Sequence, residues 1–199
     1  MWLPHGVRGG RTGIFVAVAG VNPLTVMPSM AGDLERIESR LLESASTADP
    51  TLTEIATHLI AAGGKRVRPG FTIAAAATAL SADGPATEES VTGGVAVELV
   101  HLGSLYHDDV MDEAEVRRTV DSVNARWGNL RAILAGDFLL ARASELAASL
   151  GVEVAGLLAN TIGRLCEGQL LELQHAFDVQ RSEELYLRSI DGKTASLLA

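Results

Sequence analysis

The sequence has very little cysteine and no long apolar run. Cys166 is the one cysteine in 199 residues, so an internal disulfide is excluded and a reducing, cytoplasmic setting is expected. Because Cys166 lies between Leu165 and Glu167, we interpret it as a small buried residue rather than a nucleophile. No apolar run is long enough to cross a membrane as a helix, so stable membrane insertion is not expected.

Aromatic residues and positive charge are also scarce. Aromatic residues make up 4% of the chain against 47% hydrophobic residues in all, and alanine and leucine dominate the apolar content. Strands favour β-branched and aromatic residues, so this composition predicts an all-α protein. The formal net charge of -9 argues against nucleic acid as a partner, because a nucleic-acid-binding domain needs a basic face.

The first 31 residues differ from the rest of the chain. Arg8 and Arg11 precede the apolar stretch 14–19, an arrangement that imitates a short secretory signal. Glycine and proline interrupt this region, so we interpret residues 1–31 as an unstructured leader or an over-extended start of translation. Residues 32–199 are then expected to form one helical domain.

Capping residues and turns divide this domain into helices. Asp33 is predicted to cap a first helix that ends near residue 46, and the capping-box pattern Thr51-x-x-Glu54 predicts a second that ends near Ala62. Residues 117–127 are expected to form a loop and a short helix. Further helices are predicted at 68–80, at 88–112 with Thr87 as its cap, at 130–150 and at 152–176, with a last one capped by Ser182. Such helices would pack as a bundle, which can hold polar sites between facing helices.

Three aspartates stand near the end of the predicted helix 88–112. With about 3.6 residues per turn, Asp108 and Asp112 fall on the same face of that helix, with Asp109 to the side. Their carboxylates would repel each other unless a cation lies between them. Mg²⁺ prefers oxygen ligands, and it commonly takes one or two carboxylates together with waters and substrate phosphates. The alternative is a merely solvated acidic helix end.

A second motif is the basic turn Gly63-Gly64-Lys65-Arg66-Val67-Arg68-Pro69. Backbone N–H groups at a glycine turn, with lysine and arginine beside them, can bind an anion. Alone, such a turn could also be simply solvated. Its coincidence with the aspartates and with the pair Arg117-Arg118 predicts metal-assisted handling of a diphosphate.

These motifs, with His101 between them, resemble the N-terminal half of the trans-isoprenyl diphosphate synthases, the polyprenyl synthetase family. The resemblance runs in family order from about residue 33 to residue 199. Further matching segments are Trp127-Gly128, Ala135-Gly136-Asp137-Phe138-Leu139, Glu167-Gly168-Gln169-x-x-Glu172 and Lys193-Thr194-Ala195. The family's second aspartate-rich motif would follow Lys193-Thr194 and has no counterpart in this sequence. The resemblance therefore implies an isoprenoid-synthase helical bundle truncated at its C-terminus, and we expect no turnover by this chain alone.

The resemblance also implies a reaction and a set of roles. Family members are Mg²⁺-dependent prenyltransferases that join an allylic diphosphate to isopentenyl diphosphate, and intact members are usually homodimers. The implied metal ligands are Asp108 and Asp112, with Asp109 and Lys193 as further catalytic residues. The implied isopentenyl diphosphate ligands are Lys65, Arg68, His101 and Arg118. The implied allylic diphosphate ligands are Arg117, Lys193, Thr194 and Gln169, and Glu172 with Gln169 would support the metal or the carbocation.

Two small residues bear on product length. By resemblance, Gly103 and Ser104, which precede Asp108 by five and four positions, would point down the substrate pocket. Neither would block a growing chain, so a product longer than C20 is predicted, and Gly103→Phe should shorten it.

Two other interpretations of the sequence stay open. A class I terpene cyclase would share the first aspartate motif but would not need the basic turn. A non-catalytic subunit or remnant could pair with a full-length synthase.

Overall fold

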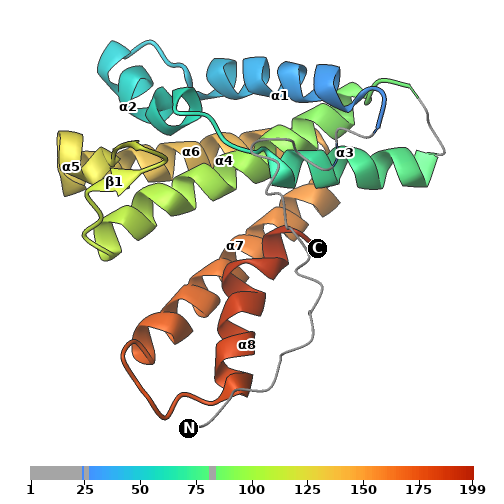
Figure 1. Ribbon diagram of the computed structural model, residues 1–199. Helices are drawn as coiled ribbons and strands as arrows, with labels where there is room; N and C mark the ends of the chain where they lie inside the picture. Colours follow the sequence, from blue (N-terminus) through green and yellow to red (C-terminus); the bar gives the residue numbers. More distant parts are fainter. Residues whose placement is uncertain (1–23, 25–26, 81–83) are drawn as a thin grey trace, which may run out of the picture.

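The computed structural model describes residues 24, 27–80 and 84–199, and within them the fold is built almost wholly from α-helices (Figure 1). This confirms the predicted all-α class. The helices are α1 (Met30–Ala45), α2 (Pro50–Ala61), α3 (Val67–Leu80), α4 (Glu88–Met111), α5 (Val123–Trp127), α6 (Asn129–Ser149), α7 (Val152–Gln174) and α8 (Glu183–Lys193), followed by a 3₁₀ turn, η2 (Ala195–Leu197). Of the unstructured leader expected at residues 1–31, residues 1–23 and 25–26 lie outside the described part, whereas Met30 begins α1 and is fully buried.

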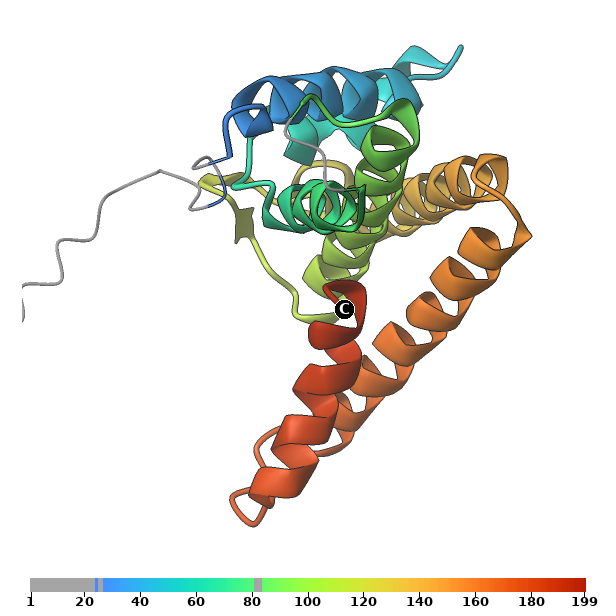
Figure 2. The same cartoon turned by 90° about the vertical axis from the view of Figure 1, so that its right-hand side faces the viewer.

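The long helix α4 is the centre of the fold, and it packs against α1, α3, α5 and α6. Helices α1 and α2 lie along one side of it, whereas α7 and α8 form an antiparallel pair that projects from the other side (Figures 1 and 2). The core around α4 contains large side chains with no exposed surface, among them Leu99, Leu102 and Tyr106. The Tyr106 hydroxyl donates to the backbone carbonyl of Ile55 at 2.8 Å, which joins α4 to α2.

Two of the predicted helix starts are confirmed. The hydroxyl of Thr87 accepts a hydrogen bond from the backbone N–H of Ser90 at the start of α4, and the hydroxyl of Ser182 accepts one from Leu185 at the start of α8. These caps use atoms three residues apart in the sequence, so local pattern is enough to find them.

The two predicted caps nearest the N-terminus are wrong. Asp33 lies inside α1, where its buried carboxylate accepts hydrogen bonds from the Ala86 backbone N–H at 3.0 and 3.1 Å. In α2 the cap is Asp49 rather than Thr51: its carboxylate accepts from the Leu52 N–H, and Pro50 occupies the first helical position. Proline suits that position because its missing N–H has no helical partner there.

Between α4 and α5 the chain forms a short antiparallel hairpin, β1 (Val116–Arg117) and β2 (Val120–Asp121), in place of the expected loop. Its two central residues, Arg118 and Thr119, have φ angles of 52° and 68°. Positive φ at both central positions is the conformation of a type I′ turn, which suits the twist of paired strands. The hairpin fixes where Arg117 and Arg118 can reach.

Glycines allow two close helix crossings. In α7, a Cβ on Gly168 would lie 2.7 Å from the carbonyl carbon of Gly192 and 2.8 Å from the carbonyl oxygen of Ser189, so α7 and α8 meet backbone to backbone. In α4, a Cβ on Gly103 would lie 3.0 Å from the carbonyl oxygen of Gly136 in α6. These crossings set the distances between the helices that line the site described next.

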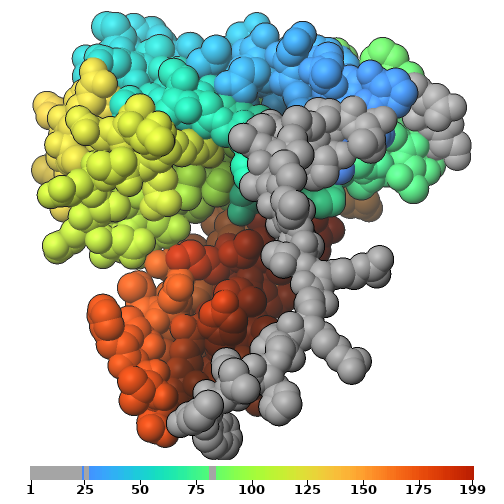
Figure 3. Space-filling view, viewed as in Figure 1, coloured from blue at the N-terminus to red at the C-terminus, as the bar shows by residue number. Residues whose placement is uncertain are grey.

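The described helices include none that is both long and apolar enough to cross a membrane. The space-filling view shows α7 and α8 as a lobe below the C-terminal end of α4 (Figure 3). Side chains from α4, α7 and α8 meet where this lobe joins the rest of the protein.

Candidate active site

A cavity of about 360 Å³ lies between α4 and the α7–α8 pair. It follows α4 from Val100 to Met111, a rise of about 16 Å at about 1.5 Å per residue. Its polar wall is formed by Arg68, His101, Ser104, His107, Asp108, Gln169, Lys193 and Thr194. The rest of the wall is mostly apolar: Val100, Met111, Leu140, Ile162, Leu165, Cys166, Leu170, Leu173 and Leu197. Cys166 is exposed to this space, so the expectation that it is buried is wrong.

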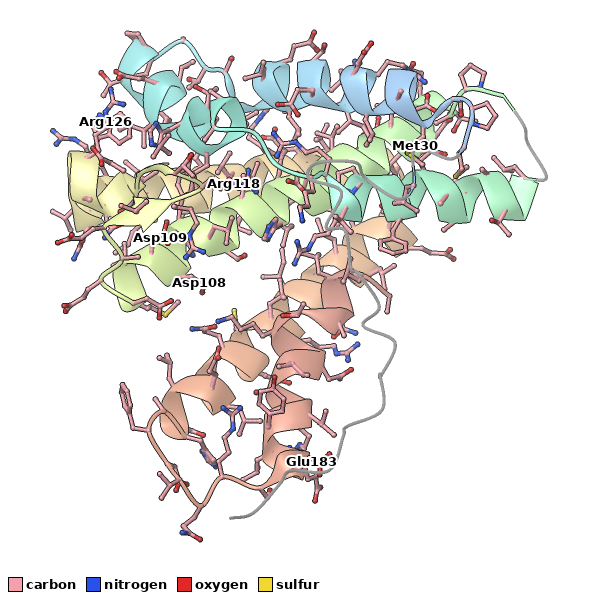
Figure 4. All side chains as sticks on the ribbon, in the orientation of Figure 1. Met30, Asp108, Asp109, Arg118, Arg126 and Glu183 are labelled. Atoms are coloured by element: carbon pink, nitrogen blue, oxygen red, sulfur yellow. The ribbon has the colours of Figure 1, made fainter. Side chains whose placement is uncertain are left out.

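Asp108 and Asp112 project from α4 toward α7 and α8, as their spacing predicts. Asp108 lines the first cavity, and Asp112 lines a second cavity of about 290 Å³ beside it. Gln169 and Lys193 line both cavities, so the two aspartates face the same pair of partners. Figure 4 shows Asp108 on the side of α4 that faces the α7–α8 lobe and Asp109 on the side of the hairpin.

The electrostatics around Asp108 favour a bound cation. Burial raises the pKa of its carboxyl, and Asp112 raises it further, whereas the ammonium of Lys193 lowers it. The Lys193 Nζ lies 4.0 Å from Asp108 Oδ2 and 2.6 Å from Glu172 Oε2. The side-chain oxygen Oε1 of Gln169 is buried without a hydrogen-bond partner. Burial and the charge of Asp112 disfavour the ionised carboxylate of Asp108, so a cation beside it would be stabilising. The unpartnered Oε1 of Gln169 is a further oxygen donor nearby.

The described residues contain no group of three or more His, Cys, Asp or Glu placed to hold a metal ion. The donors at hand are thus one or two carboxylates, which is the set Mg²⁺ uses when waters and substrate phosphates complete its shell. The oxygen-only donor set of Asp108 and Asp112 fits that ion, and it lacks the nitrogen and sulfur ligands of a zinc site.

Asp109 has a different environment from its neighbours. Its side chain is fully buried, and its Oδ1 accepts hydrogen bonds from Arg117 Nε at 2.8 Å and Nη2 at 2.5 Å. This pairing is the main reason that the pKa of Arg117 is raised. Neither Asp109 nor Arg117 lines either of the two cavities, but the positive charge of Arg117 lowers the pKa of Asp108 and the negative charge of Asp109 raises it, so both act on the site through their charge.

Positive charge gathers at the other side of the first cavity. Arg68 lies on its wall beside His101, and the Nε of Arg68 is buried without a hydrogen-bond partner. Burial lowers the pKa of Arg68, and Glu98 raises it. Burial, together with the positive charges of Arg68, Arg118, Arg117 and Arg66, lowers the pKa of His101 to about 3. A neutral imidazole among arginines marks a place where an anion would be stabilised.

The basic turn is only partly exposed. Lys65 is exposed, whereas Arg66 is 6% exposed and is held by the carboxylates of Glu38 and Glu98. Arg118 donates from Nη1 to the backbone carbonyls of Leu59, at 3.0 Å, and Gly63. Sequence reasoning assigned no role to Glu38 or Glu98. The one signal in the sequence concerns Glu98, because it is an acidic residue on the apolar face of α4.

His107 is a further residue that sequence reasoning missed. Its Nε2 lies 3.2 Å from the Ile133 carbonyl oxygen and 3.3 Å from Asp137 Oδ1. A Cβ on Gly136 would collide with the His107 ring, which explains the need for glycine in the Ala135-Gly136-Asp137 segment. His107 lines the first cavity next to Asp108.

The structure separates the two residues expected to control product length. Ser104 lines the cavity. Gly103 does not: a side chain there would point at α6, with its Cβ 3.0 Å from the Gly136 carbonyl oxygen and 3.2 Å from Leu140 Cγ. The expectation that Gly103 lies on the pocket wall is therefore corrected, and Gly103→Phe should disrupt the α4–α6 crossing instead.

The shifted pKa of His101 gives a testable pH dependence. The folded protein holds His101 neutral down to a pKa of about 3, whereas an unfolded histidine takes up a proton near 6.5. Between these values the unfolded state binds more protons, so this residue makes stability fall as pH falls below 6.5. In His101→Asn the free energy of unfolding should fall less steeply, by up to about 1.4 kcal/mol per pH unit. Urea unfolding from pH 7.5 to 5.0 measures this, and parallel curves for the two proteins would contradict it.

Comparison with known proteins agrees with the resemblance seen in the sequence. The family model for polyprenyl synthetase matches residues 49–199. A nonaprenyl diphosphate synthase of Mycobacterium tuberculosis is 41% identical over 183 residues, covering 91% of this chain and 54% of the relative. The chain thus spans about half the length of the curated relatives it matches.

Solved structures give the same result. A decaprenyl diphosphate synthase from Rhodobacter capsulatus superposes with a TM-score of 0.80 at 36% identity, covering 88% of this chain and 54% of the other. A polyprenyl synthase from Caulobacter crescentus, complexed with calcium and isoprenyl diphosphate, superposes with a TM-score of 0.77 at 34% identity, covering 84% of this chain and 50% of the other. The isoprenoid-synthase helical bundle predicted from the sequence is therefore the observed fold.

Proposed function

Because the chain belongs to the polyprenyl synthetase family, we propose that its site condenses an allylic diphosphate with isopentenyl diphosphate to make a polyprenyl diphosphate longer than C20. One observation carries this proposal. Asp108, Lys193, Arg68 and His101 line a single cavity whose remaining wall is mostly apolar. Such a cavity offers a charged region for diphosphates and an apolar region for a prenyl chain.

The allylic diphosphate would bind at the side of the cavity where α4 meets α8. Asp108 and Asp112 would hold Mg²⁺ there, and the bound ion would act as a Lewis acid on the leaving diphosphate. Lys193 already lies beside Asp108, so its ammonium is placed to hold the same diphosphate, with Thr194 and Gln169 on the same wall. Arg117 donates from Nε and Nη2 to Asp109, so it would have to give up part of this pairing to bind the allylic diphosphate. The Caulobacter crescentus relative is complexed with calcium and isoprenyl diphosphate, which supports binding of a divalent cation together with a diphosphate.

Isopentenyl diphosphate would bind at the basic side. Arg68 has a buried Nε that lacks a partner, and His101 lies beside it as a neutral imidazole that can donate through one ring N–H. Lys65 and Arg118 flank them on the basic turn and the hairpin. These residues would fix the diphosphate so that the alkene of isopentenyl diphosphate faces the allylic carbon. Holding the two reactants in one cavity removes much of the entropic cost of their meeting.

The apolar wall would protect the carbocation formed when the allylic C–O bond breaks. Leu140, Ile162 and Leu165 line that part of the cavity and would exclude water from it when substrate is bound. The alkene attacks the cation, and the released diphosphate takes the proton that the product loses. The nonaprenyl and decaprenyl diphosphate synthases among the relatives support a long product for this chain as well.

Ser104 offers a direct test of the prenyl position. In Ser104→Phe the ring would fill part of the cavity, so the affinity for a C20 allylic diphosphate should fall at least about tenfold, the scale on which one or two methylenes matter in an apolar pocket. Affinity for inorganic diphosphate should stay the same, because the charged side is unaltered. Isothermal titration measures both. Ser144→Phe, on the exposed face of α6, is the matched control, and equal losses for both ligands would contradict the assignment.

Incubation with Mg²⁺, farnesyl diphosphate and labelled isopentenyl diphosphate tests the function as a whole. Mg²⁺-dependent binding of farnesyl diphosphate is the expected minimum, and labelled products longer than C20 would establish the full reaction. If neither diphosphate binds in a Mg²⁺-dependent way, the proposal is wrong. If the chain binds both substrates but forms labelled product only when a second protein is added, the result would correspond to the hypothesis of a non-catalytic subunit.

A further inference from the structure

Glu98 is an acidic residue in the middle of the apolar helix α4. It is 2% exposed, and its helical neighbours Val95, Leu99 and Leu102 belong to the core. A carboxylate in such surroundings is costly unless it is paired, so its partners indicate its purpose. Burial raises the pKa of Glu98, and the nearby arginines lower it, Arg66 most of all. Glu98 lines neither of the two site cavities, so it does not itself face a substrate.

The principal partner of Glu98 is Arg66. Arg66 Nη1 donates to Glu98 Oε1 at 2.9 Å, while Nε and Nη2 donate to the two oxygens of Glu38 at 2.7 and 2.8 Å. Nη2 also donates to the Ile60 carbonyl at 3.1 Å. With its three nitrogens engaged, Arg66 has a structural task within the basic turn. Its backbone has a φ of 47°, a conformation that needs such support in a residue other than glycine.

The second partner of Glu98 is Arg118. Its Nη2 lies 3.9 Å from Glu98 Oε1, and its Nη1 is anchored on the carbonyls of Leu59 and Gly63. Figure 4 shows Arg118 between the hairpin and α4. A Cβ on Gly64 would lie 2.9 Å from Arg66 Nη1 and 3.0 Å from Arg118 Nη1, so the two guanidinium groups come together at this glycine. Two positive groups this close need the negative charge that Glu98 supplies.

The charges of the cluster do not cancel. Arg66, Arg68 and Arg118 contribute three positive charges, and Glu38 and Glu98 contribute two negative ones. Arg66 and Arg118 form ion pairs with Glu98, whereas Arg68 lines the cavity and its buried Nε has no hydrogen-bond partner. The carboxylates thus pair with Arg66 of the turn and with Arg118 of the hairpin, and Arg68 stays on the cavity wall, where it can bind an anion.

We propose that Glu98 is a positioning residue of the diphosphate site: through Arg66 and Arg118 it holds the turn 63–68 in the shape that presents Arg68 to the isopentenyl diphosphate. This inference rests on the function proposed above and extends it to a residue that touches no substrate. It also predicts the direction in which the affinity for an anion changes when Glu98 is removed. If Glu98 acted only as a nearby negative charge, its removal would strengthen the binding of an anion. If it positions the turn, its removal weakens binding.

The test is the affinity of the purified chain for inorganic diphosphate, measured by isothermal titration in Glu98→Gln. We expect the dissociation constant to rise about tenfold or more, the scale of one lost hydrogen bond to a charged group. Glu89→Gln is the matched control, because Glu89 is an exposed carboxylate in the first turn of the same helix. Tighter or unchanged binding in Glu98→Gln would overturn the proposal.

Glu38→Gln is a milder variant, included because unfolding of Glu98→Gln would also weaken diphosphate binding. In Glu38→Gln, Arg66 keeps its bonds to Glu98 and Ile60, and the lost carboxylate is 39% exposed, so a smaller loss in the same direction is expected. In the double variant Glu98→Gln with Arg66→Gln the effects should not add, because Glu98 acts partly through Arg66. Full additivity would contradict the proposed route.

Amide hydrogen exchange without any ligand separates this inference from the proposed function. In Glu98→Gln, exchange at residues 64–68 and 118–119 should accelerate relative to α8, which forms no side-chain hydrogen bond or ion pair with the cluster among the described residues. No selective acceleration would refute the positioning role, whatever the diphosphate titration shows. If exchange accelerates but the unaltered chain binds no diphosphate, the positioning of the turn stands and the proposed function fails.

Discussion

Replacing Gly168 with alanine is expected to push α7 and α8 apart and to destabilise the protein. The added Cβ would meet the Gly192 carbonyl carbon at 2.7 Å and the Ser189 carbonyl oxygen at 2.8 Å. These are backbone atoms of a facing helix, so no side chain can rotate away to make room. Overpacking a tight contact costs about 1–3 kcal/mol, and we expect the upper part of that range here. Urea unfolding followed by helix circular dichroism measures the loss.

The same change should also reach the candidate site. Lys193 follows Gly192, the residue that Gly168 faces, and its Nζ lies near Asp108 and Glu172. A shift of α8 would move this ammonium, so binding of an allylic diphosphate should weaken more than binding of diphosphate at the basic turn.

Gly163→Ala is the matched control on the same helix. A Cβ at Gly163 meets nothing within 4 Å, so only the helix preference for alanine remains, and we expect a gain of about 0.5–1 kcal/mol. The two variants make the same chemical change with opposite expected signs. If Gly168→Ala unfolded at the same urea concentration as Gly163→Ala, the close crossing would have no energetic role.

Local features of the fold could be predicted from the sequence. Thr87 and Ser182 cap helices through atoms three residues away, and the period of the helix places Asp108 and Asp112 on one face. Each of these relations lies within about one turn, where the helix alone fixes the geometry. The resemblance to a known family then connected the separate motifs.

Partners far apart in the sequence could not be predicted in the same way. Asp33 resembles a helix cap, but its carboxylate binds the Ala86 N–H 53 residues later. Arg66 resembles a surface charge, yet it is buried between Glu38 and Glu98. Gly103 lies one residue from Ser104, but that step rotates it about 100° round the helix and turns it from the cavity to α6. In each case tertiary packing decided the role.

In Asp108→Asn we expect the Mg²⁺-dependent part of diphosphate binding to be lost. The amide keeps the size of the side chain but removes the charge that would hold the cation. Losing one partner of a close charge pair costs about 2–5 kcal/mol, or about 30- to 5,000-fold in affinity. Burial and the charge of Asp112 raise the pKa of Asp108, so its carboxylate is a destabilising charge in the protein without a cation. The variant should therefore be at least as stable as the original chain at neutral pH.

Asp109→Asn tests the contrast between adjacent aspartates. Asp109 is buried and paired with Arg117, so losing its charge should destabilise the fold by up to about 3 kcal/mol, because Arg117 is 31% exposed and partly screened. Its direct effect on Mg²⁺-dependent binding should be small, because Asp109 faces away from the cavities. Titrations with inorganic diphosphate, with and without Mg²⁺, and urea unfolding distinguish the two variants. If Asp108→Asn lost stability and kept its Mg²⁺ dependence while Asp109→Asn did the reverse, the side of α4 that faces the hairpin would be the metal side.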